Sequence, residues 1–209
     1  MDKQIEVEYM GKISKEKFDE LKIKFNQEGK FKKLKKRLTF MYFRDYIPKD
    51  LEEIKNEEVD LRVRITNKEP ELIIKKGLFT GSHARKEISI GFKLEEISKY
   101  IDMLTALSWK IGVIYAVETN VFEYGDIEFA LVNIENYGYN FEAEILTDEK
   151  NQEEAKNKIK SKLDELGLNP FNEEELNEQC NNINNNKELQ YDFSKTSFEE
   201  IKKGFEEFF

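Results

Sequence analysis

Two short segments, far apart in the chain, each carry two glutamates at alternate positions. They are Glu6 with Glu8 and Glu142 with Glu144. Successive side chains of a β-strand point to opposite faces, so each pair shares one face of its strand. Carboxylate oxygens are the ligands that hard cations such as Mg²⁺ or Mn²⁺ require. If both faces look into one cavity, the four glutamates can hold a divalent metal ion.

Cationic side chains show the same alternation in the segments between these glutamates. The pairs and single residues concerned are Arg62 with Arg64, Lys75 or Lys76 before Gly77, and Arg85 with Glu87. On an exposed antiparallel sheet, such residues would form cross-strand ion pairs that contribute about 0.2–1 kcal/mol each. The regular order, with carboxylates at both ends and cations between them, instead favours a sheet closed into a barrel with a charged interior.

Several elements must position these side chains. Strands are expected over 5–10, 38–45, 60–65, 71–76, 84–90, 111–123, 126–134 and 137–146, and amphipathic helices after Ser14, over 94–109 and over 153–166. The basic run 30–37 is interpreted as a solvated loop or the start of a strand, with a phosphate-attracting rim as the alternative. After a helix from Asn172 and an asparagine-rich linker at 181–186, a last helix begins near Ser197. Its apolar face packs on its own domain or, alternatively, forms a homodimer or partner contact.

Composition limits the possible partners and compartments. The chain has 209 residues, a formal net charge of -9 and 37% charged residues. That charge argues against general nucleic-acid or anionic-membrane binding, which depends on neutralising phosphates. The single cysteine, Cys180, excludes an internal disulfide and is expected to be a core thiol in a reducing compartment. No membrane-spanning run or signal-peptide core is seen, so the cytoplasm is expected.

The order and spacing of these motifs resemble the CYTH family, also called triphosphate tunnel metalloenzymes. The match covers roughly residues 4 to 168: Glu6-Val7-Glu8, Gly11 and a helix, Arg62-x-Arg64, Lys75-Lys76-Gly77, Arg85-x-Glu87, and Gly138 leading into Glu142-x-Glu144. The family includes class IV adenylyl cyclases, thiamine triphosphatases and inorganic triphosphatases. The resemblance implies an α+β fold in which an antiparallel eight-stranded β-barrel forms a tunnel with helices packed outside. It also implies a tunnel domain at 1–168 and a C-terminal helical extension at 169–209.

The resemblance further implies the roles of the charged residues. Glu6, Glu8, Glu142 and Glu144 would hold Mg²⁺ or Mn²⁺, and Arg62, Arg64, Lys75 or Lys76, and Arg85 would bind a triphosphate. Three positions depart from the family pattern, because Met10, Val117 and Thr119 stand where the family has cations. The aspartate usual on the next strand falls at Val132 or Asn133. Because charge-assisted contacts contribute on the order of 1.5–3 kcal/mol each, these losses should weaken ground-state binding.

The expected function is metal-dependent hydrolysis of a triphosphate-containing substrate, which is inorganic triphosphate, polyphosphate or an organic triphosphate. Arg62 and Arg85 would stabilise the charge that develops on phosphate oxygens, and Glu87 would hold an arginine in place or act as a general base. One alternative is a catalytically impaired phosphate- or nucleotide-binding module that acts through its C-terminal helices. A class IV-type adenylyl cyclase is the less favoured alternative, because no adenine-reading signature is seen.

Overall fold

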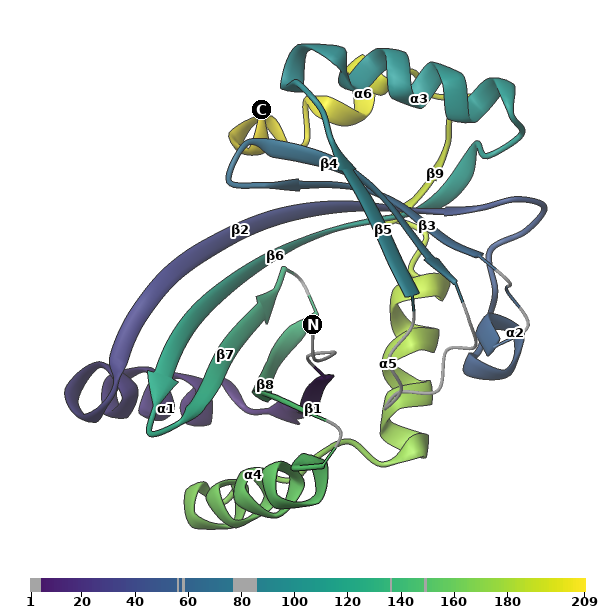
Figure 1. Cartoon of the computed structure of the whole chain (residues 1–209). Helices are drawn as coiled ribbons and strands as arrows, with labels where there is room; N and C mark the ends of the chain where they lie inside the picture. Colours follow the sequence, from purple (N-terminus) through teal and green to yellow (C-terminus); the bar gives the residue numbers. More distant parts are fainter. Residues whose placement is uncertain (1–4, 56, 58, 77–85, 136, 149) are drawn as a thin grey trace. The chain divides into compact units, whose positions relative to one another are not determined.

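The computed structural model describes residues 5–55, 57, 59–76, 86–135, 137–148 and 150–209 (Figure 1). These residues form two compact units. Unit 1 comprises 1–35 and 117–173, and unit 2 comprises 36–116 and 174–209. Two long strands, β2 (Lys30–Phe43) and β6 (Ile111–Tyr124), contribute residues to both units. The division expected from the sequence at residue 168 stays a prediction.

The strands form one sheet in the order β1-β8-β7-β6-β2-β3-β4-β5, and a short strand, β9, pairs with β6. The remaining strands are β1 (Ile5–Ile13), β3 (Val59–Thr66), β4 (Glu69–Lys76), β5 (Lys86–Gly91), β7 (Ile127–Ile134), β8 (Gly138–Thr147) and β9 (Gln190–Asp192). The pairs β1–β8, β7–β8, β6–β7, β2–β3, β3–β4 and β4–β5 are antiparallel. The α+β class and the antiparallel sheet of eight main strands are confirmed. Among the described strands, this order ends at β1 and at β5.

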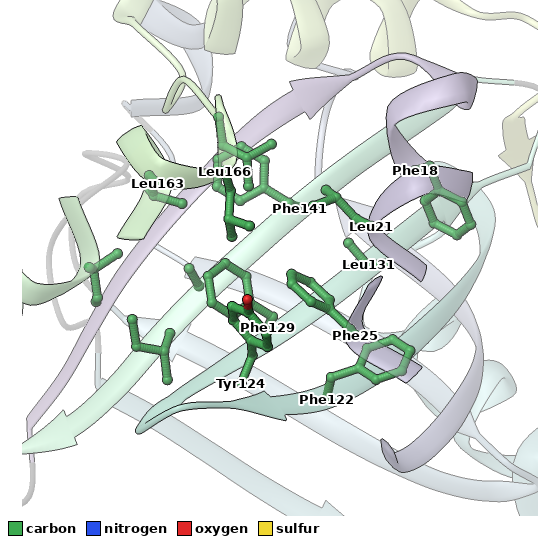
Figure 2. Packing of buried hydrophobic residues seen from close by; sticks show 14 of the residues in the cluster. Phe18, Leu21, Phe25, Phe122, Tyr124, Phe129, Leu131, Phe141, Leu163 and Leu166 are labelled. Atoms are coloured by element: carbon green, nitrogen blue, oxygen red, sulfur yellow. The ribbon is translucent and has the colours of Figure 1, made fainter. Parts of the chain in front are cut away.

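In unit 1, two helices cover one face of the sheet. They are α1 (Lys15–Glu28), which begins with a bond from the Lys17 backbone N–H to the Ser14 side chain, and α4 (Gln152–Leu166). Figure 2 shows aromatic residues of α1 and of the strands packed together in the core beneath them. Phe25 lies at its centre, with its ring centroid 5.0 Å from that of Phe129 and 5.6 Å from that of Phe122. The other face of these strands carries the glutamates of β1 and β8 together with a small apolar cluster on β7.

Unit 2 has its own core. Ile97, Ile101 and Leu104 of α3 (Ile97–Ala106) are buried in one cluster with residues of β2 and β3. Phe198 of α6 (Phe198–Lys202) and Phe208 of the 3₁₀ turn η2 (Glu206–Phe208) are buried in the same cluster. This burial favours the interpretation in which the last segment packs on its own unit. The remaining short elements are α2 (Leu51–Lys55), η1 (Leu94–Glu96) and α5 (Glu173–Asn185).

The basic run 30–37 is part of the strand β2, which agrees with the start of a strand and not with a loop. Two other elements differ from the sequence predictions. Residues 181–185 of the asparagine-rich stretch belong to α5. Their side chains hold a distant segment, since Asn184 Nδ2 donates to the Pro48 carbonyl oxygen at 2.9 Å and Asn185 Nδ2 to that of Lys49 at 3.0 Å. The strand β9 was not expected at all. None of the described helices is long and apolar enough to cross a membrane.

Candidate functional site

The polar face of unit 1 carries the predicted glutamates. In the β1–β8 register, Glu8 lies opposite Glu144, and Met10 lies opposite Glu142. Directly opposed residues of an antiparallel pair point to the same face, so all four share one face of the sheet. Val7 and Ala143 point to the other face and are buried in the core. Glu6 lies opposite Leu146 in the backbone register, and its side chain is outside the described residues.

A further carboxylate, which the sequence interpretation missed, extends this face. Glu128 of β7 lies opposite Glu144 of β8, so Glu8, Glu144 and Glu128 form a row across three neighbouring strands. The expected carboxylate position on β7 was Val132 or Asn133, and Val132 is buried. The alternation of Glu128 with the core residues Ile127 and Phe129 was the signal that could have placed it on this face.

The donors on this face suit a hard divalent cation in kind, since carboxylate oxygens are what Mg²⁺ and Mn²⁺ prefer. Among the residues that the structure describes, no group of three or more acidic, histidine or cysteine side chains lies close enough together to hold a metal ion. The side chain of Glu6 is not among them. The four-glutamate metal site therefore stays a prediction that rests on donor chemistry.

The same face is apolar where the family pattern has cations. Val117 lies opposite Ile134, and Thr119 lies opposite Val132. Ala130, Val132 and Ile134 form a small buried cluster, against which Val117 packs. Thr119 is itself buried. An apolar cluster therefore lies beside the two positions where the resemblance leads one to expect cations.

The polar face of unit 2 carries the predicted arginines. Arg62 and Arg64 alternate in β3 with Leu61, Val63 and Ile65, which are buried in the core. On the polar face, Arg64 lies between Thr39 of β2 and Glu71 of β4, while Arg62 lies between Met41 and Ile73. The hydrophobic alternation of β3 therefore fixes both guanidinium groups on one face.

Arg62 is held by a carboxylate on its own strand. Its Nε and Nη2 atoms donate to Oδ1 and Oδ2 of Asp60, each at 2.7 Å. The two side chains are only 13% and 14% exposed. Bidentate pairs of this kind have a fixed geometry, so Asp60 orients the guanidinium plane of Arg62.

Arg64 is less completely satisfied. Its Nη1 atom lies 3.6 Å from Oε1 of Glu71, too far for a good hydrogen bond. Its Nε atom is buried and has no hydrogen-bond partner in the described part of the chain. Burial lowers the pKa of Arg64, and the nearby charges of Arg37 and Arg62 lower this pKa further. A guanidinium keeps its proton even so, which leaves a buried cationic donor suited to an anion.

The remaining predicted residues are only partly described. Lys75 lies opposite Asp60 on one side and Glu87 on the other, which places Lys75 on the face of Arg62 and Arg64. Lys76, the next residue, points to the other face. The Glu87 side chain and the whole of Arg85 lie outside the described residues.

Cys180 has no place in this chemistry. Its thiol lies in α5 and is half-buried, and burial raises the pKa of Cys180 to about 11. The thiol is therefore protonated at neutral pH, and the protonated form is a poor nucleophile.

Comparison with known proteins identifies the fold. No protein-family model and no curated protein matches the sequence. Solved structures do: a protein of Pyrococcus horikoshii is 23% identical, with a TM-score of 0.62 over 81% of this chain and 94% of that one. A conserved hypothetical protein of Pyrococcus furiosus is also 23% identical, with a TM-score of 0.60 over 79% of this chain and 92% of that one. A Hippeastrum protein, described as a candidate adenylyl cyclase with a dominant triphosphatase activity, is 16% identical. Its TM-score is 0.55 over 79% of this chain and 89% of that one.

Proposed function

From the CYTH-like fold that this chain shares with those structures, we propose that it is a divalent-metal-dependent hydrolase of a triphosphate-containing substrate. One observation carries the proposal. Arg64 presents a buried Nε donor without a partner in the described part of the chain, on the same face as the bidentately held Arg62. A phosphate oxygen satisfies such a donor and compensates the charges of both arginines. The described function of the Hippeastrum structure agrees with this proposal.

The chemistry is phosphoryl transfer, in which the protein supplies positioning and charge neutralisation. Arg62 enters the reaction already oriented by Asp60, so little entropy is lost when it meets the phosphate chain. Arg64, Lys75 and Arg85 bind further phosphate oxygens, and Glu87 positions an arginine or accepts a proton. Glu6, Glu8, Glu142 and Glu144 would hold Mg²⁺ or Mn²⁺, which when bound supplies a Lewis acid for phosphate oxygens and lowers the pKa of a water.

A second candidate function has its own observation. The buried cluster of Ala130, Val132 and Ile134 packs against Val117, one of the positions where the family pattern has a cation. A site with fewer cations stabilises the charge of a phosphoryl-transfer transition state less, so a bound phosphate compound would not be turned over. In that case the chain is a binding module whose output passes through its C-terminal segment, in the cytoplasm, to a partner or to a second copy of the chain.

Measuring phosphate release distinguishes the hydrolase from the binding module. The purified chain is given tripolyphosphate, ATP or thiamine triphosphate with Mg²⁺ and then with Mn²⁺. The hydrolase proposal expects metal-dependent release that Glu144→Gln lowers by about 100-fold or more, the scale on which the loss of one preorganised electrostatic group lowers the rate of an enzyme. The matched control is Glu154→Gln, which removes the same charge from an exposed position of α4 in the same unit and should leave the rate unchanged.

Other outcomes decide against hydrolysis. No release from any of the three compounds, together with a melting temperature that rises with tripolyphosphate, would establish the binding module. Pyrophosphate from ATP without orthophosphate would indicate a cyclase.

A further inference from the structure

We infer that Arg37, at the end of the basic run in β2, is a third phosphate-binding arginine of this site. The inference rests on the proposed function and adds a residue to it. The sequence offered a phosphate-attracting rim only as an alternative for the whole run 30–37, and no predicted motif places Arg37 itself beside the Arg62-x-Arg64 pair. Its position, and the absence of a carboxylate partner for it among the described residues, carry the inference.

The strand register puts Arg37 on the arginine face. Thr39 lies opposite Arg64, and Arg37 lies opposite Thr66. Residues two apart in a strand point the same way, so Arg37 is the diagonal neighbour of Arg64. Leu38, between Arg37 and Thr39, is fully buried in the core, which fixes this assignment of faces.

The hydrogen bonding of Arg37 leaves most of its guanidinium for a ligand. Its Nε atom donates to Oγ1 of Thr66 at 3.3 Å. Within the described part of the chain, Arg37 has no other hydrogen bond and no ion pair. The neutral hydroxyl orients the side chain without cancelling its charge. The Nη1 and Nη2 atoms then form the fork that binds two oxygens of one phosphate group.

The charge balance of the face points to an anion. Arg37, Arg62 and Arg64 bring three positive charges, and the structure shows Asp60 paired with Arg62 and Glu71 with Arg64. Both oxygens of Asp60 accept from Arg62, whereas the Glu71 oxygen lies 3.6 Å from Arg64 Nη1, too far for a good hydrogen bond. The charges of Arg37 and Arg62 both disfavour the charged form of Arg64, so the three groups are close enough to interact. Like charges that are partly buried together need a counterion, and a phosphate chain supplies one.

Arg37 also supplies a phosphate-binding cation in a chain that lacks several cations of the CYTH pattern. Met10, Val117 and Thr119 leave the face of unit 1 without three cations of the family pattern. Arg37 adds one cation to the face of unit 2. The phosphate grip is therefore expected to depend mainly on arginines of β2 and β3.

Two substitutions test this role against a purely structural one. Arg37→Met removes the charge and keeps an apolar stem, and Arg37→Lys keeps the charge but loses the fork. The matched control is Lys36→Met, which removes the same charge from the neighbouring residue. Lys36 points to the opposite side of β2 and forms an exposed ion pair with Glu207 at 3.1 Å.

The measurement is titration calorimetry of tripolyphosphate in buffer with EDTA, so that no turnover occurs, with a thermal melt of each variant. We expect Arg37→Met to weaken binding about 10-fold or more, Arg37→Lys to weaken it less, and Lys36→Met to change it less than about twofold. Arg37→Met and Lys36→Met with equal affinities would overturn the inference while leaving the proposed function intact. If the wild-type chain fails to bind tripolyphosphate both in EDTA and with Mg²⁺, the proposed function fails too.

Discussion

Asp60 and Arg62 form a bidentate ion pair between two residues of one strand, with both N–O distances at 2.7 Å. The pair lies on the polar face of β3 and is largely buried. Because the carboxylate meets Nε and one Nη atom, it fixes the guanidinium plane and leaves the other Nη atom pointing away from Asp60. Arg62 is thus oriented before any ligand binds.

Asp60→Asn should weaken triphosphate binding and lower stability together. The neutral amide cannot make the charged bidentate pair, so the Arg62 guanidinium loses its fixed orientation and the negative charge that balances it. We expect a loss of about 1–3 kcal/mol in the free energy of unfolding and a severalfold rise in KM. Urea denaturation and steady-state kinetics measure the two effects. Asp102→Asn, at an exposed position of α3, is the control; equal effects of both variants would count against the orienting role.

Arg64→Met should separate stability from function. The buried Nε of Arg64 lacks a partner in the described residues and its cation is desolvated, so an apolar side chain is expected to keep or raise the melting temperature. Tripolyphosphate affinity should fall about 10-fold or more, because a charged donor is lost. Differential scanning fluorimetry and calorimetric titration provide the two readings. A lower melting temperature with unchanged affinity would show that Arg64 is structural.

The reactivity of Cys180 should report its raised pKa. With a pKa of about 11, the thiol is almost wholly protonated at pH 8. Labelling by a thiolate-specific disulfide reagent should therefore be on the order of 100-fold slower in the folded chain than in urea. The sign for stability follows: the folded state holds the proton more tightly, so this contribution is fully present below the unfolded pKa near 9 and is lost as pH rises towards about 11. Cys180→Ser is the blank, and fast labelling of the native chain at pH 8 would contradict the assignment.

Gly112→Ala should be among the most destabilising small substitutions in unit 2. A Cβ atom at this position would lie 1.9 Å from the carbonyl oxygen of Met41 and 2.5 Å from the Tyr191 hydroxyl, which donates to that same oxygen at 3.1 Å. We expect a loss of about 1–3 kcal/mol from overpacking. Gly204→Ala is the matched control, because its nearest neighbour would be 3.5 Å away. Chemical denaturation compares the two variants. Similar midpoints would mean that Met41 and Tyr191 can move away from the added methyl group at little cost in stability.

Much of the fold could be predicted from local patterns. Helix α1 follows from Ser14 and the spacing of Phe18, Leu21 and Phe25, and β3 follows from the strict alternation of buried residues with arginines. These patterns report which face is buried, so they also predicted the common face of Arg62 and Arg64 correctly.

Cross-strand neighbours were harder to predict. The row of Glu8, Glu144 and Glu128, and the diagonal of Arg37 and Arg64, depend on register between strands that are far apart in the sequence. Register comes from packing over the whole sheet, and alternation within one strand does not contain it. The strand β9 was missed for a related reason. Its three residues are too few for a pattern and are held by pairing with β6 and by the buried Tyr191.

The interleaving of the two units has a consequence for synthesis on the ribosome. The chain passes from unit 1 to unit 2, back to unit 1 and back again to unit 2. Unit 1 cannot be completed until α4 has been made, and the core of unit 2 still waits for Phe198 and Phe208. Half-made chains therefore expose unpaired strands of both units, which is the condition under which strand edges associate wrongly. The nascent chain is expected to depend on chaperones more than its size suggests.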